Sequence, residues 1–186
     1  MKILRKVFVL AVMTMFLVLN CGAVYADTAE RTNDNEKYRY EEVSTIDTTE
    51  AKYLIVTENY GCFGIDMHTL CSKNMSVSGK YVNVYKQDDG LYEVNNVNSE
   101  QLWSFSKTGN LENLKDVKIR NSNGMGLVIN KTSLGLGVLG DNLSIGKAED
   151  RYFISSAKAN LNYDNHKFSS SDETYSYVRI FKQVEQ

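Results

Sequence analysis

Short hydrophobic runs alternate with polar turns along most of the chain, from about residue 52 to its end. The apolar residues recur at every second position or in compact β-branched clusters, which is typical of strands. Gly, Asn, Asp and Ser fill the turns, and the chain has no proline. The pattern predicts an all-β barrel or sandwich of about ten short strands. The predicted strands are 53–56, 61–66, 80–86, 91–94, 102–106, 117–120, 126–129, 142–145, 151–154 and 177–181.

One β-hairpin is predicted directly by the alternation. Within residues 80–86, Tyr81 and Tyr85 share one face of the strand and two valines share the other. An Asp-Asp-Gly turn signal follows, and the next strand phrase lies at 91–94.

One sequence unit is repeated about three times, at residues 53–66, 117–129 and 152–164. Each unit consists of a predicted strand, a polar turn and an apolar segment that is marked by glycine or another small residue. Each unit closes on an aromatic or β-branched strand, and these closing phrases are 101–105, 150–154 and 176–181. Internal repetition of short β units points to a repeat architecture. Three such units predict a β-trefoil-like barrel, in which a short barrel is capped by three hairpins.

Two phrases resemble the repeat of ricin-B-type lectins. Residues 61–66, Gly-Cys-Phe-Gly-Ile-Asp, are similar to the Gly-x-Cys-Leu-Asp phrase of that family, and residues 101–103, Gln-Leu-Trp, match its Gln-x-Trp closing phrase. The stretch from about residue 52 to residue 182 also resembles trefoil-like repeat domains on secreted and surface proteins of Gram-positive bacteria. The resemblance implies that Asp66 accepts hydrogen bonds from sugar hydroxyls and that Trp103 points into the core.

A carboxylate beside an aromatic ring is the minimum for holding a sugar, because the hydroxyls need acceptors and the apolar face needs a stacking surface. The candidate ligand-binding residues are Asp66 with Tyr81 or Tyr85, and Asp164 with Tyr163 or Phe168. In the alternative interpretation, both aspartates are turn residues that cap their own backbone.

The N-terminus has three basic residues within its first six positions, an apolar run at 7–19 and small residues up to Ala26. This layout predicts a secretory signal peptide, residues 1–26, cleaved after Ala26. Lipid attachment at Cys21 is one alternative. A retained membrane helix is another, but the run falls short of the roughly 20 residues that a bilayer core requires. We expect a secreted protein without an integral membrane span after processing.

Residues 27–51 are rich in Asp, Glu, Asn and Thr and have few apolar residues, so they are predicted to form a disordered acidic linker. The β-trefoil-like domain would then span residues 52–186. Cleavage removes three positive charges and no negative ones, which moves the formal net charge from −2 to −5. The sequence contains no basic cluster, which argues against nucleic acid or an anionic membrane as a partner.

Two cysteines, Cys62 and Cys71, remain after cleavage, and in an oxidising compartment they predict one disulfide. The alternative is a metal site that they form with Asp66 and His68, although the ligand spacing is unfamiliar. Neither His68 nor His166 lies in a recognisable nucleophile or metal motif. We therefore expect no enzyme activity, no cofactor and no metal.

These features predict a secreted, non-catalytic binding module whose partner is a glycan. The alternative is a protein-binding trefoil, such as a protease inhibitor or a host-interaction factor, whose loop at 86–98 or 169–175 inserts into a surface protein. The 12 tyrosines fit either interpretation, since tyrosine suits both contact surfaces and strands.

Overall fold

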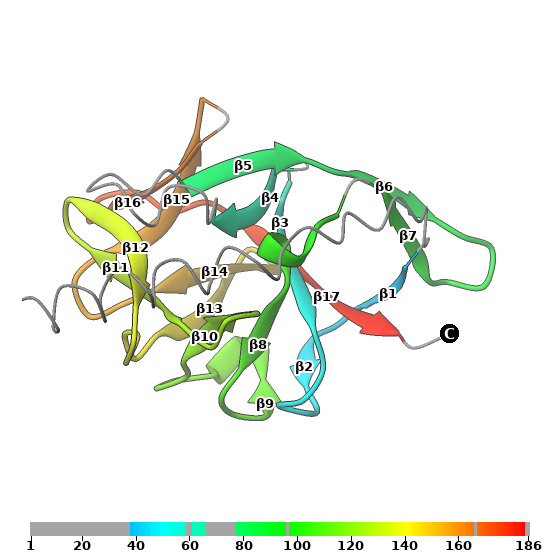
Figure 1. Ribbon diagram of the computed structural model, residues 1–186, viewed down its shortest axis with the longest axis horizontal. Helices are drawn as coiled ribbons and strands as arrows, with labels where there is room; N and C mark the ends of the chain where they lie inside the picture. The colour runs from blue at the N-terminus through cyan, green and yellow to red at the C-terminus, as the bar shows by residue number, and fades with distance from the viewer. Residues whose placement is uncertain (1–37, 59–60, 66–76, 96, 166, 185–186) are drawn as a thin grey trace, which may run out of the picture. The chain divides into compact units, whose positions relative to one another are not determined.

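The computed structural model describes residues 38–58, 61–65, 77–95, 97–165 and 167–184, which belong to the unit Lys37–Gln186. These residues form an all-β structure with two short 3₁₀ helices (Figure 1). The predicted signal peptide, Cys21 and the first part of the predicted linker lie outside the described residues. Within the described part, no helix has the length and apolar character needed to span a bilayer.

Six strands pair side by side into a closed ring. They are β3 (Tyr53–Thr57), β8 (Trp103–Phe105), β10 (Ile119–Asn121), β13 (Ser144–Ala148), β14 (Arg151–Ser155) and β17 (Val178–Val184). β3 pairs with β8 and β17, β8 pairs with β10, and β14 pairs with β13 and β17. A bridge between Val117 and Leu143, just before β10 and β13, completes the ring.

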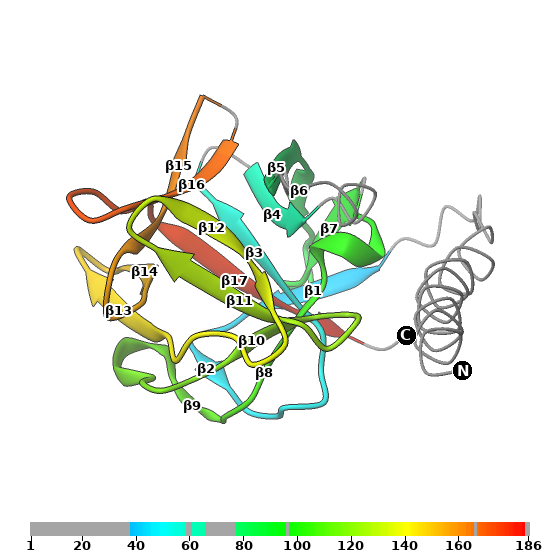
Figure 2. The same ribbon diagram turned by 60° about the vertical axis from the view of Figure 1, so that its left-hand side comes forward.

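Three hairpins follow ring strands β3, β10 and β14, and the first strand of each pairs with the ring strand that precedes it. The hairpins are β4 (Gly61–Ile65) with β5 (Val77–Tyr81), β11 (Gly126–Asn130) with β12 (Ser133–Gly137), and β15 (Asn160–Asp164) with β16 (Lys167–Ser171). Figure 2 shows β11–β12 and β15–β16 as separate hairpins. The repeated phrases of the sequence thus correspond to a ring strand and the hairpin after it.

The prediction of a disordered linker as far as residue 51 is wrong for the part of it that the structure describes. β1 (Arg39–Glu42) pairs with β17, and β2 (Thr45–Ile46) pairs with β9 (Gly109–Asn110). Tyr40 and Ile46 are fully buried. These strands are short and each buries a single large side chain among exposed polar ones, so their composition imitates that of a disordered segment.

The predicted hairpin around the Asp-Asp-Gly turn is confirmed. β6 (Asn83–Lys86) pairs with β7 (Tyr92–Asn95), and β7 also pairs with β1. This insertion separates the first hairpin from its closing strand β8. The remaining elements are the helices η2 (Ser99–Gln101) and η3 (Leu111–Asn113).

The core has two parts, and β3 contributes to both. Tyr53 and Ile55 face the main cluster, which contains Phe63 and Trp103. Leu54 and Val56 face the second cluster, to which β1, β6 and β7 also contribute. All five residues of β3 are buried. A strand covered on both faces needs an unbroken apolar run, which explains the Tyr-Leu-Ile-Val phrase.

Candidate functional site

The sequence-predicted ligand residues are distributed over different hairpins. Asp66 lies outside the described residues, and Tyr81 is the last residue of β5. Tyr85, on β6, is 52% exposed. Tyr163 is half-buried and Asp164 exposed, both at the end of β15.

The hairpin registers show which turn positions correspond. Asn130 pairs with Ser133 at the end of β11–β12, and Asp164 pairs with Lys167 at the end of β15–β16. In the first hairpin the last pair among the described residues is Ile65 with Val77, and Asp66 lies outside them. Cys62, Gly126 and Asn160 pair with the preceding ring strands, and Asp66, Asn130 and Asp164 each lie four residues after them in the sequence.

Tyr163 and Asp164 are adjacent in a strand, so their side chains point to opposite faces of the hairpin. The Tyr163 ring packs against Phe168, with 4.7 Å between ring centroids, and lies against the backbone of Gly61. The structure thus gives Tyr163 a packing role between hairpins, and the two residues do not face one ligand together.

Trp103 is fully buried, which confirms the core role predicted for it. Its indole N–H donates to the carbonyl of Phe63 at 2.9 Å, and the two rings stack with centroids 4.6 Å apart. Trp103 therefore offers no face to a ligand.

Cys62 is fully buried and carries a free thiol, whose pKa is raised by burial away from water. Its predicted disulfide partner, Cys71, lies outside the described residues, as do Asp66 and His68 of the alternative metal site. The structure therefore does not show the disulfide. The described residues contain no group of three or more His, Cys, Asp or Glu side chains suited to a metal.

Three aromatic rings gather at the surface beside β14, and we call Phe153, Tyr175 and Tyr177 the aromatic cluster. Phe153 and Tyr175 stack with centroids 4.6 Å apart, and Tyr177 meets Tyr175 edge to face at 5.4 Å. A hydrogen bond with Tyr175 raises the pKa of the Tyr177 phenol. Tyr175 is 40% exposed, so part of its ring remains open to a ligand.

Arg151 and two glutamates border the aromatic cluster. The Arg151 guanidinium carbon lies 3.7 Å from the centroid of the Tyr177 ring and covers one of its faces. Arg151 donates to both carboxylate oxygens of Glu58, at 2.9 and 3.0 Å, and to Glu149 at 2.7 Å. These bonds, foremost those to Glu58, raise the pKa of Arg151. The Glu149 side chain is 74% exposed, which leaves its carboxylate accessible to a ligand.

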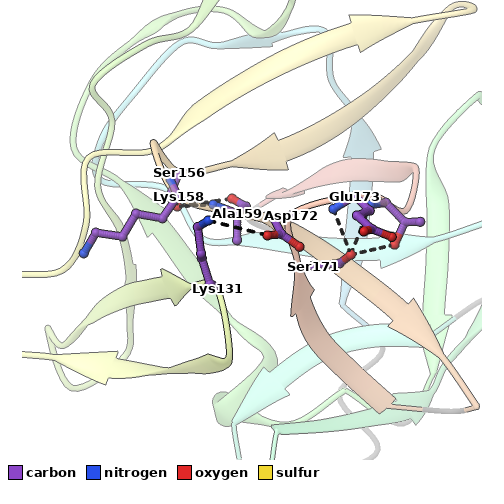
Figure 3. A network of polar contacts seen from close by, with 8 residues as sticks. Lys131, Ser156, Lys158, Ala159, Ser171, Asp172 and Glu173 are labelled. Carbon is purple, nitrogen blue, oxygen red and sulfur yellow. Dashed lines mark hydrogen bonds and ion pairs between the residues drawn. The ribbon is translucent and has the colours of Figure 1, made fainter.

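The loop that carries Tyr175 is fixed by local polar contacts. Ser171 Oγ accepts hydrogen bonds from two backbone N–H groups later in the loop, at 3.3 and 3.0 Å. Lys131, from the turn of the second hairpin, points toward Asp172 with 3.7 Å between Nζ and Oδ2 (Figure 3). On the other side, Ser176 Oγ accepts from a backbone N–H of β15 at 2.8 Å. Tyr175 thus projects from an ordered loop.

The register of β14 with β17 brings the cluster together. Tyr152 lies opposite Val178, so Arg151 and Phe153 project from the other face of β14, next to the two tyrosines that precede β17. Sequence reasoning assigned this loop to the protein-binding alternative and did not connect it with β14. The sequence does contain a sign of this cluster: residues 151–153 read Arg-x-Phe and residues 175–177 read Tyr-x-Tyr, so each pair lies on one face of an extended segment.

Comparisons with protein-family models and with curated proteins give no match. Among solved structures, the chain is similar to SeviL bound to asialo-GM1 saccharide, with 17% sequence identity and a TM-score of 0.46. The similarity covers 70% of this chain and 95% of that chain. This similarity is too distant to assign a site or a ligand to the chain.

Proposed function

We propose that this protein is a secreted, non-catalytic module of β-trefoil type that binds carbohydrate through the aromatic cluster. The trefoil assignment is supported by the closed ring of six strands and by the hairpin that follows every second strand of that ring. Export is supported by the composition of residues 1–26, and lipid attachment at Cys21 remains the alternative route to the cell surface.

The observation that carries the proposal is the exposed ring of Tyr175 beside the carboxylates that flank Arg151. The C–H groups on one face of a pyranose are apolar and stack on an aromatic ring, whereas its hydroxyl groups need directed acceptors and donors. Glu149 and Glu58 supply acceptors, and the Arg151 guanidinium and the tyrosine hydroxyls supply donors. Both kinds of contact are available within one surface.

The site is also organised before a ligand arrives. Arg151 is held by two carboxylates, and Tyr175 is supported by the stacked ring of Phe153. Ligand binding therefore costs little side-chain conformational entropy, which favours affinity.

A glycan array with the purified protein, followed by calorimetry with the best saccharide, tests the proposal. Replacing Tyr175 with Ala removes the stacking surface and should weaken binding by a factor of about 2 to 13, because an aromatic contact contributes about 0.5–1.5 kcal/mol. The matched control is Tyr85→Ala, an exposed tyrosine on the β6–β7 hairpin, which should leave affinity unchanged. Binding that is lost in the control and kept in Tyr175→Ala, or an array without any saccharide bound, would overturn the proposal.

A further inference from the structure

Two consecutive apolar side chains project into solvent between β12 and β13. Val138 is 78% exposed and Leu139 is 76% exposed, the largest values for large hydrophobic residues in the described part of the chain. We call these two residues the apolar tip. Single exposed apolar residues are ordinary on protein surfaces, but adjacent side chains that are both more than three-quarters exposed form a protrusion.

The backbone beneath the apolar tip is rigidly held. Gly140 has a φ of +64° and lies so close to Gly126 that a Cβ on it would come 2.7 Å from the Cα of Gly126. The next residue, Asp141, donates its N–H to the carbonyl of Leu127 at 2.8 Å, and its carboxylate accepts from the N–H of Ile129 at 2.8 Å. The loop therefore cannot easily fold the tip back onto the domain.

Positive charges surround the apolar tip. Lys118 Nζ donates to the carbonyls of Leu139 and Gly140, at 2.6 and 3.2 Å, and Arg120 donates to the carbonyl of Val138 at 3.4 Å. Lys158 lines the same recess of about 330 Å³ as Lys118 and Leu139.

These three cations have no carboxylate partner among the described residues. Carbonyl and amide groups orient Lys118, Arg120 and Lys158 but leave their net charge intact. Asp141 is the carboxylate that lines the recess, and one of its oxygens is engaged by Ile129. The linear sequence has no basic run, yet folding brings Lys158 to the same apolar protrusion as Lys118 and Arg120, which belong to a separate segment.

We propose that the apolar tip inserts into the surface of an anionic lipid bilayer, with Lys118, Arg120 and Lys158 facing the headgroups. A convex apolar tip fits a bilayer without any matching hollow, whereas a folded partner or a small ligand would need a complementary pocket. Cations set behind inserted apolar residues lie at the depth of the lipid phosphates, where anionic headgroups attract them. This inference is independent of the carbohydrate site and would place the module at a membrane surface.

Fluorescence of a tryptophan placed in the tip tests insertion directly. The variant Leu139→Trp is mixed with vesicles of phosphatidylcholine alone or with added phosphatidylglycerol, some carrying brominated acyl chains. We expect a blue shift of the emission and quenching by bromine with the anionic vesicles only. Because the signal comes from residue 139, attachment of the chain by its apolar N-terminal residues does not imitate it. Buried Trp103 adds the same background to every sample.

Two controls make the test specific. Tyr85→Trp places a tryptophan at another exposed position and should show neither shift nor quenching. Adding Lys158→Gln to Leu139→Trp should weaken vesicle binding about fivefold, the expected effect of one cation near an anionic surface. The proposal is overturned if Leu139→Trp shows no quenching, if neutral and anionic vesicles give equal quenching, or if the Tyr85→Trp control is quenched as strongly.

Discussion

The ring of Tyr163 lies on the backbone of Gly61, so that a Cβ atom at position 61 would come within 2.3 Å of Tyr163 Cζ. Gly61 begins β4 and Tyr163 lies in β15, which places this contact between the first and third hairpins. The pairing of β5 with β16 joins the same two hairpins. A glycine is needed here because any side chain would occupy the space of the ring.

Replacing Gly61 with Ala should therefore lower the free energy of unfolding by about 1–3 kcal/mol, the usual cost of overpacking a filled interior. Urea unfolding followed by circular dichroism measures the change. The double variant Gly61→Ala/Tyr163→Leu makes room for the methyl group, so it should lose less stability than the sum of the two single changes. Additive losses would show that the contact does not constrain these residues.

Glu42 attaches β1 to the ring through Arg179. The guanidinium of Arg179 donates to both Glu42 oxygens, at 2.8 and 2.6 Å, and the Tyr92 hydroxyl donates to one of them at 3.1 Å. The hydrogen bonds from Arg179, more than any other contact, lower the pKa of Glu42 from its ordinary value of 4.5. A lowered folded-state pKa contributes stability that is complete above the ordinary pKa and is lost as the pH falls through the folded value.

We therefore expect Glu42→Gln to destabilise the protein at neutral pH, by about 1 kcal/mol or less because the pair is partly exposed. The difference between Glu42→Gln and the unchanged protein should shrink as the pH falls below 4.5, the ordinary pKa of the group. Urea unfolding at several pH values measures this difference in the free energy of unfolding. Glu41→Gln is the control, since Glu41 is an exposed neighbour on the same strand. An equal effect in both variants would show that the bond to Arg179 contributes nothing specific.

The sequence predicts the ring strands well because they carry the signal that burial requires. The predicted runs 53–56 and 177–181 are rich in apolar and β-branched residues, and they correspond to the ring strands β3 and β17. The strand β12 was missed, because its Ser-Leu-Gly-Leu-Gly phrase has two glycines and its side chains are largely half-buried. Its position comes from pairing with β11, which is a property of the folded hairpin.

The candidate site was harder to predict than the fold. Phe153 and Tyr175 lie far apart in the sequence and meet only because β14 and β17 are neighbours in the ring. Composition identified a surplus of tyrosines but could not separate packed rings, such as Tyr53, from exposed ones, such as Tyr175. That distinction depends on strand register, which a single sequence without an alignment leaves open.

Gly146 supports the aromatic cluster from the neighbouring strand β13. It lies opposite Phe153, and a Cβ at Gly146 would come 2.5 Å from Phe153 Cζ. Gly146→Ala should push the Phe153 ring away from this position, disturb the stack with Tyr175 and weaken saccharide binding measured by calorimetry. Gly137→Ala is a matched control in β12, where the added methyl would meet Val128 Cγ2 at 3.1 Å. Equal affinity in both variants would show that Phe153 does not position the site.

Trp103 provides a final test, because it joins the core to the closing strand of the first unit. Its ring is fully buried, so the native emission should be blue-shifted relative to exposed tryptophan and should not respond to saccharide. Trp103→Phe keeps an aromatic ring but removes the donor to the Phe63 carbonyl, a bond of 2.9 Å within the core. Removing one partner of a buried hydrogen bond costs about 1–3 kcal/mol, so urea unfolding should show a loss of that size. A smaller loss would mean that the Phe63 carbonyl finds another partner, such as water. Emission that shifts on addition of saccharide would mean that the indole lies near the ligand.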